Sequence, residues 1–160
     1  MLPHLVLLPI LCKVLAESSA PMCTCIPPKT VTAQVRQAVQ RADVVVAGSV
    51  LELRWKVAQL WPDRPDSRTM FRLAVMIPER SWKGDVADTL ILWTPDSEDV
   101  CGYPFVEGER YLVFATRRDS TSLSTGLCTL TQPLAGADRY LRVLGAPEHR
   151  FHSDSGVRRP

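Results

Sequence analysis

Residues 43–55, DVVVAGSVLELRW, decide the fold of this chain. β-Branched residues come first, and apolar and polar residues then alternate, which is the pattern of a β-strand with one buried face. Gly48 interrupts the run, so we expect a long strand that is broken near this residue. A strand of this length needs partner strands, and they are found further along the sequence.

Short apolar or alternating runs between turn signals predict four more strands. They lie at 70–82, 89–94, 110–117 and 124–131, with a long loop at 95–109. Apolar residues at helical spacing predict one helix at 31–42 and another at 133–145. Five strands at short spacing, with a helix before and after them, predict a mainly β protein built on a small, closed or partly closed five-stranded barrel.

The two ends of the chain differ from this central part. Residues 5–12, LVLLPILC, form an apolar run too short for a membrane span, and small residues follow it. We therefore predict a signal peptide with a short pro-extension at 1–22 and a secreted, extracellular protein with no membrane span. A buried N-terminal helix or a membrane anchor is the alternative. The polar residues at 146–160 predict a flexible tail.

The cysteines agree with secretion. Four of the five follow the predicted signal peptide, and an even set permits three disulfide pairings. Cys23 and Cys25 point to the same side of an extended segment, and each can reach a different loop beside the fourth strand. We predict Cys23–Cys101 and Cys25–Cys128, with the crossed pairing as the second possibility.

Several classes of function are not expected. A formal net charge of +2 is too small to indicate nucleic acid as a partner. The histidines that follow the signal, His149 and His152, lie in the polar tail, so we expect no Cys/His metal site and no cofactor. No nucleophile and base are arranged as in an enzyme, and we expect a non-enzymatic monomer.

Two motifs resemble a known family. CTCIPP at 23–28 resembles the N-terminus of mature tissue inhibitors of metalloproteinases (TIMPs), and EDVCGYPF at 98–105 is similar to a connecting loop of that family. Stretches at 42–50, 79–85, 101–115 and 127–137 look like the related netrin-like domains. The resemblance covers residues 23–145 and implies one domain with an OB-type five-stranded barrel, two flanking helices and disulfide staples.

The resemblance also implies a function. TIMPs inhibit zinc endopeptidases of the matrix-metalloproteinase type, and the amine and carbonyl oxygen of their first cysteine chelate the protease zinc. That cysteine corresponds to Cys23. A catalytic zinc keeps one open position, and an α-amine with a pKa of about 7.7–8.0 loses its proton at neutral pH for about 1 kcal/mol.

Other roles follow by position. The resemblance implies that Thr24 points toward the main specificity pocket of the protease, and that Cys25, Ile26 and Pro27 lie along its cleft. It implies that two residues of the 95–109 loop occupy the other side of the cleft. These residues are Asp99 and Val100.

This sequence departs from the family at its N-terminus. Chelation requires Cys23 to be the first residue, but cleavage there would place Met22 at the −1 position, where small residues are preferred. Cleavage after Ala16 or Ala20 would instead start the protein at Glu17 or Pro21. A non-inhibitory secreted netrin-like module, which binds extracellular matrix or another secreted protein, is therefore the alternative function.

The cysteine content also departs from the family. Residues 31–42 lack the cysteine for a third disulfide of the N-terminal domain, which removes a staple without destroying the barrel. No cysteine follows Cys128, so the second, cysteine-rich subdomain of vertebrate TIMPs has no counterpart here. Functions of that subdomain are not transferred.

Overall fold

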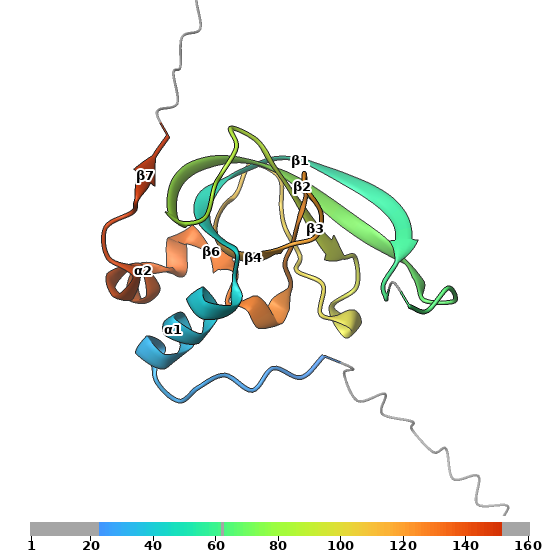
Figure 1. Ribbon diagram of the computed structural model, residues 1–160, viewed down its shortest axis with the longest axis horizontal. Helices are drawn as coiled ribbons and strands as arrows, with labels where there is room; N and C mark the ends of the chain where they lie inside the picture. The colour runs from blue at the N-terminus through green and yellow to red at the C-terminus, as the bar shows by residue number, and fades with distance from the viewer. Residues whose placement is uncertain (1–22, 62, 152–160) are drawn as a thin grey trace, which may run out of the picture.

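The computed structural model describes residues 23–61 and 63–151 (Figure 1). The predicted signal peptide and pro-extension at 1–22 lie outside the described residues. The helices are α1 (Val31–Arg41), α2 (Asp138–Leu144) and the 3-10 helices η1 (Glu98–Val100), η2 (Leu127–Thr129) and η3 (Leu134–Gly136). The strands are β1 (Val44–Gln59), β2 (Arg68–Lys83), β3 (Leu90–Pro95), β4 (Arg110–Arg117), β5 (Leu123–Ser124), β6 (Gln132–Pro133) and β7 (His149–Arg150).

Five of the strands form a closed ring. β1 pairs antiparallel with β2 and with β4, and β2 pairs antiparallel with β3. β3 pairs parallel with β5, and β5 pairs antiparallel with β4. The order β1-β2-β3-β5-β4 therefore returns to β1, as in an OB-type barrel. The predicted mainly β fold, with a five-stranded barrel, two helices and disulfides, is confirmed.

The first part of β1 belongs to the barrel, and its second part forms a hairpin with β2. Residues 44–48 are all buried, because one face lines the barrel interior and the other lies under the helices. The register against β2 shifts near Gly48, where a Cβ atom would lie 2.2 Å from the carbonyl oxygen of Ile77. The predicted break is thus a set of bulges that lets β1 and β2 come close. Beyond Val50, β1 no longer pairs with β4 but stays paired with β2, and the end of this hairpin projects from the barrel (Figure 1).

The apolar core has two parts. Inside the ring, buried side chains of the five strands pack with three aromatic rings, Tyr103, Phe105 and Tyr111. Burial and, to a smaller extent, Tyr111 raise the pKa of Tyr103 to about 12, so its phenol stays neutral. Outside the ring, α1 and α2 cover one face of β1 and β4. This second part packs α1 and α2 together against the barrel.

Both ends of α1 are stabilised by side chains. Thr30 is the N-cap, and its hydroxyl accepts a hydrogen bond from the backbone N–H of Ala33. At the other end, the ammonium of Lys83 donates hydrogen bonds to the carbonyl oxygens of Val39 and Ala42, at 2.8 and 2.6 Å. The helix predicted at 31–42 is confirmed, and its start sets where the preceding residues must lie.

Two predicted elements are shorter than expected. The strand predicted at 124–131 is limited to β5, because the chain turns at Gly126 into η2. The helix predicted at 133–145 begins only at Asp138, after η3. Among the helices of residues 23–151, residue 62 aside, none is long and apolar enough to cross a membrane.

The flexible tail predicted at 146–160 is wrong for its first part. β7 pairs antiparallel with β2, and the backbone N–H groups of Glu148 and Phe151 donate to the carbonyl oxygens of Ser81 and Glu79. Backbone groups on the edge of β2 form hydrogen bonds with this polar stretch. Side-chain composition does not reveal pairing of this kind. Residues 152–160, which include His152, lie outside the described residues.

Candidate functional site

The N-terminal segment, residues 23–28, has no regular secondary structure and passes along the outside of the molecule to α1 (Figure 1). Its side chains are largely exposed, and Ile26 is 90% exposed. Within the described residues its backbone makes one hydrogen bond, from the side-chain amide of Gln34 to the carbonyl oxygen of Pro28 at 2.8 Å. The segment therefore relies on covalent attachment.

Two disulfides provide that attachment. Cys23 is bonded to Cys101 and Cys25 to Cys128, with Cα–Cα distances of 5.0 and 5.3 Å. These are the predicted pairs, and the crossed pairing is not formed. The bonds pack against each other, with the sulfur of Cys23 3.7 Å from that of Cys128. Three of the sulfur atoms lie within 4.8 Å of one another, but all are in disulfides and none is a thiolate ligand for a metal.

The loop that carries Cys101 is shaped by η1. The hydroxyl of Ser97 accepts a hydrogen bond from the backbone N–H of Asp99 at 3.2 Å, which starts the turn. Cys101 ends it in the left-handed conformation, with φ of 63°, and its N–H donates to the carbonyl oxygen of Glu98. This reversal of the chain directs Cys101 toward Cys23.

Glycines bring the two cysteine loops together. A Cβ atom on Gly102 would lie 1.9 Å from the carbonyl oxygen of Pro95, and one on Gly126 would lie 2.5 Å from that of Cys101. The same oxygen of Cys101 accepts a hydrogen bond from the N–H of Leu127 at 3.0 Å. Close backbone approach thus joins the loops before and after β4, and both disulfides lie at this junction.

The structure brings the predicted site residues to one end of the molecule. Thr24, Cys25, Ile26 and Pro27 are exposed in the N-terminal segment. The exposed Asp99 and half-buried Val100 of η1 directly precede Cys101, to which the segment is bonded. Figure 1 shows η1 beside the start of the segment. Together they form one exposed edge of the molecule.

The projecting hairpin adds apolar side chains that the sequence analysis did not single out. Trp55 and Val57 lie across from Arg72 and Met70, and the exposed fractions of Trp55, Val57 and Met70 are 54%, 46% and 42%. The indole N–H of Trp55 and the guanidinium of Arg72 both bind the carboxylate of Asp96, which precedes η1. The sequence predicted strands at 43–55 and 70–82, and the structure extends the first to Gln59 and starts the second at Arg68, which lengthens the hairpin.

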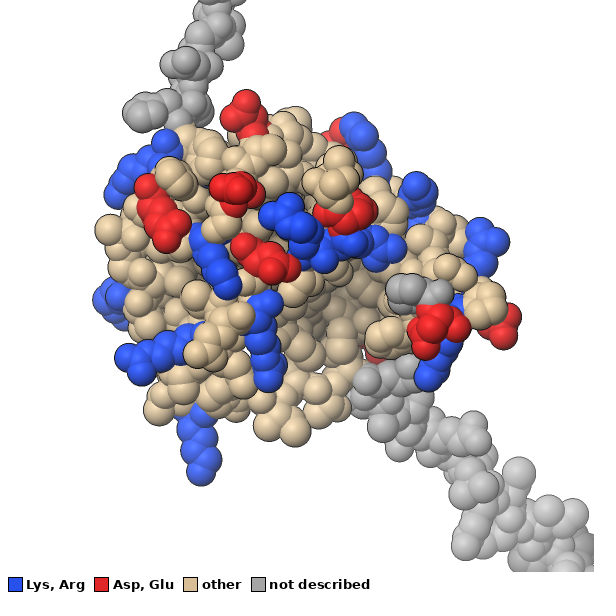
Figure 2. Space-filling view, viewed as in Figure 1, with Lys and Arg blue, Asp and Glu red and all other residues tan. Residues whose placement is uncertain are grey.

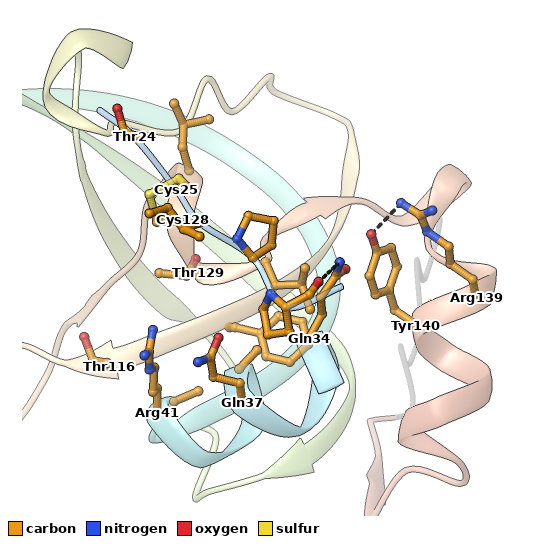
Figure 3. A pocket seen from close by; sticks show the side chains of 18 residues that line it. Thr24, Cys25, Gln34, Gln37, Arg41, Thr116, Cys128, Thr129, Arg139 and Tyr140 are labelled. Atoms are coloured by element: carbon orange, nitrogen blue, oxygen red, sulfur yellow. Dashed lines mark hydrogen bonds between the residues drawn. A yellow bond between two sulfur atoms is a disulfide. The ribbon is translucent and has the colours of Figure 1, made fainter. Parts of the chain in front are cut away.

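A hollow lies beneath the N-terminal segment and was also not foreseen. It has a volume of about 710 Å³ and is bounded by the segment, α1, β4, η2 and α2 (Figure 3). Its lining is contributed by elements that are far apart in the sequence, so no local motif could predict it.

Charge is distributed unevenly around this site. Residues 23–42 contain Lys29, Arg36 and Arg41 and no acidic residue. In Figure 2 the part of the surface over α1 shows basic side chains without acidic ones, while the acidic groups gather above it. The surface around α1 is therefore positive.

No family model and no curated protein matches the chain.

Proposed function

We propose that this protein is a secreted inhibitor of zinc metalloendopeptidases of the matrix-metalloproteinase type. The observation that carries the proposal is the Cys23–Cys101 disulfide, which holds the exposed residues Thr24–Pro27 beside Asp99 and Val100. An extended, exposed segment can enter a protease cleft as a product-like strand. Its covalent anchoring reduces the entropy that is lost on binding.

The chemistry assigned to Cys23 needs only groups of its backbone. A neutral α-amine and the adjacent carbonyl oxygen can bind the protease zinc together and displace its water. An α-amine with an ordinary pKa of about 7.7–8.0 is readily deprotonated at neutral pH, whereas a lysine with a pKa of about 10.4 is not. The zinc belongs to the protease, and the inhibitor needs no metal of its own.

The neighbouring residues have positions that suit their proposed roles. Thr24 directly follows the chelating residue, so its side chain would enter the pocket beside the zinc. Cys25, Ile26 and Pro27 would continue along the cleft, and Asp99 and Val100 would contact its opposite side.

The test uses two forms of the protein that differ only at the N-terminus. One begins at Cys23, and the other carries an additional alanine before it, which turns the amine into a non-basic amide. We expect the first to inhibit cleavage of a fluorogenic peptide by a matrix-metalloproteinase-type enzyme and the second to be at least 100-fold weaker. Circular dichroism of both forms controls for folding.

Equal inhibition by the two forms would show that the amine is not the chelator. If neither form inhibits any protease of this type, the alternative of a non-inhibitory secreted binding module replaces the proposal. If the form that begins at Cys23 does inhibit, the N-terminal sequence of the protein recovered from the secreting cell shows which function operates in vivo, because a start at Glu17 or Pro21 blocks the amine.

A further inference from the structure

The hollow beneath the N-terminal segment has the character of a small-molecule site. Its volume of about 710 Å³ lies within the range of about 300–1,000 Å³ that is typical of ligand pockets. We propose that it binds an amphiphile with one carboxylate and an apolar chain. This proposal does not depend on the proposed inhibition of proteases.

The apolar part of the hollow would hold the chain. Phe114 of β4, Leu127 of η2 and Leu130 line it together with Pro27 and Pro28 of the N-terminal segment. These side chains come from opposite sides, so an apolar chain between them is removed from water on both faces. Each buried methylene contributes about 0.8 kcal/mol in such a transfer.

The polar end would hold the carboxylate. Gln37 and Arg41 of α1 and Thr116 of β4 lie near one another at one end of the hollow (Figure 3). They offer a guanidinium, an amide and a hydroxyl, all of which can donate to a carboxylate. Arg41 presents the planar pair of donors that binds a carboxylate with two parallel hydrogen bonds.

Arg41 is available for this role. Within residues 23–61 and 63–151 its guanidinium makes no ion pair and no hydrogen bond. The nearest acidic residue in the sequence, Asp43, accepts a hydrogen bond from the backbone N–H of Arg117 instead. By contrast, Arg139, on another side of the hollow, donates to the hydroxyl of Tyr140 at 2.5 Å and stacks on its ring. Charge complementarity therefore favours an anionic head group beside Arg41 and disfavours a cationic one.

The N-terminal segment is one wall of the hollow, and a ligand would support it. The segment is fixed at its start by disulfides and at Pro28 by Gln34, with no backbone hydrogen bond between. A bound chain would add apolar contacts along this span. Binding should therefore slow hydrogen exchange at the amides of Thr24, Cys25 and Ile26.

Decanoate below its micellar concentration is the probe, and isothermal titration calorimetry measures its dissociation constant. We expect binding to the unmodified protein, at least tenfold weaker binding to Arg41→Gln, and at least tenfold weaker binding to Gln37→Glu, which places a like charge beside the head group. Arg36→Gln is the matched control, because it removes an exposed arginine of the same helix that does not line the hollow. Its affinity should stay within twofold.

Three results would overturn the proposal. Decanoate could fail to bind, Arg41→Gln could bind as tightly as Arg36→Gln, or decyltrimethylammonium could bind as tightly as decanoate. Hydrogen exchange adds a test of location: protection of the hairpin around Trp55, rather than of Thr24–Ile26, would place the ligand elsewhere.

Discussion

Thr24 stands between the two disulfide-bonded cysteines of the N-terminal segment, and its side chain is exposed. Thr24→Gly removes the side chain that is proposed to enter the specificity pocket and leaves the barrel untouched. We expect inhibition of at least one metalloproteinase to weaken tenfold or more, measured as an inhibition constant across a panel of proteases. Thr24→Ser keeps the hydroxyl, and its inhibition constant should fall between those of the unmodified protein and Thr24→Gly. An unchanged panel with an unchanged melting temperature would remove Thr24 from the site.

Asp119 shows how a single exposed turn sets a local pKa. A hydrogen bond from the hydroxyl of Ser122, followed by bonds from the backbone and side chain of Thr121 and the backbone of Ser122, lowers the pKa of Asp119 to about 2. Because the pKa is lower than in the unfolded chain, about 3.9, the ionised carboxylate favours the folded state above pH 4. That contribution is lost as the pH falls through 2.

NMR titration of the Asp119 carboxyl carbon measures this pKa directly. The midpoint should lie near pH 2 in the unmodified protein and rise toward the ordinary range in Ser122→Ala, which deletes the largest cause of the shift. Ser120→Ala is the control, because Ser120 is exposed and makes no hydrogen bond to Asp119 within the described residues. A midpoint near 4 in the unmodified protein would contradict the turn geometry.

At the scale of elements, Gly102 tests how η1 is positioned. Gly102→Ala places a Cβ atom 1.9 Å from the carbonyl oxygen of Pro95, so the loop before Cys101 must move. We expect the free energy of unfolding to fall by about 1–3 kcal/mol, as for other overpacked sites, measured by urea denaturation. Gly136→Ala is the matched control, since its Cβ atom would meet nothing within 4 Å. Equal effects of the two substitutions would mean that this close approach is not structural.

The elements also show what a sequence can reveal. Long strands such as β1 and β4 were predicted because their side chains alternate or are all apolar, and α1 because its apolar residues follow a helical period. β5 was predicted too long and β7 was not predicted at all, because each spans two residues whose pairing depends on a distant strand. The exposure of the β1–β2 hairpin could not be predicted either. Trp55 and Val57 are residue types that are usually buried in strands, but here they are exposed.

For the molecule as a whole, some features of the candidate site could be predicted from the sequence and others could not. The disulfide pairs could be predicted because Cys23 and Cys25 point to the same side of an extended segment and the other two cysteines lie in the loops that flank β4. The hollow could not, because its polar end combines Arg41 with Thr116, which are neighbours only once α1 lies on β4. Sequence motifs therefore indicated the N-terminal segment and η1, whereas the hollow beneath the segment results from the packing of distant elements and has no motif.

The two disulfides close loops that span much of the chain, and they can be separated experimentally. The bonds join residues 78 and 103 positions apart, for which the loop-entropy model gives nearly equal stabilisation, differing by about 0.25 kcal/mol. We therefore expect Cys25→Ser with Cys128→Ser, and Cys23→Ser with Cys101→Ser, each to lower the free energy of unfolding by about 2–5 kcal/mol. Both should still unfold cooperatively, because neither core cluster includes residues 23–28.

Their effects on inhibition should differ. The variant that lacks Cys25–Cys128 keeps the amine of Cys23 anchored to Cys101, so it should retain measurable inhibition. The variant that lacks Cys23–Cys101 loses the anchor at η1 and should lose at least 100-fold. Urea denaturation and inhibition constants, measured on the same preparations, separate the two contributions. If both variants lose inhibition in proportion to their stability, the disulfides only support the fold, and the Cys23–Cys101 bond has no special role in orienting the amine.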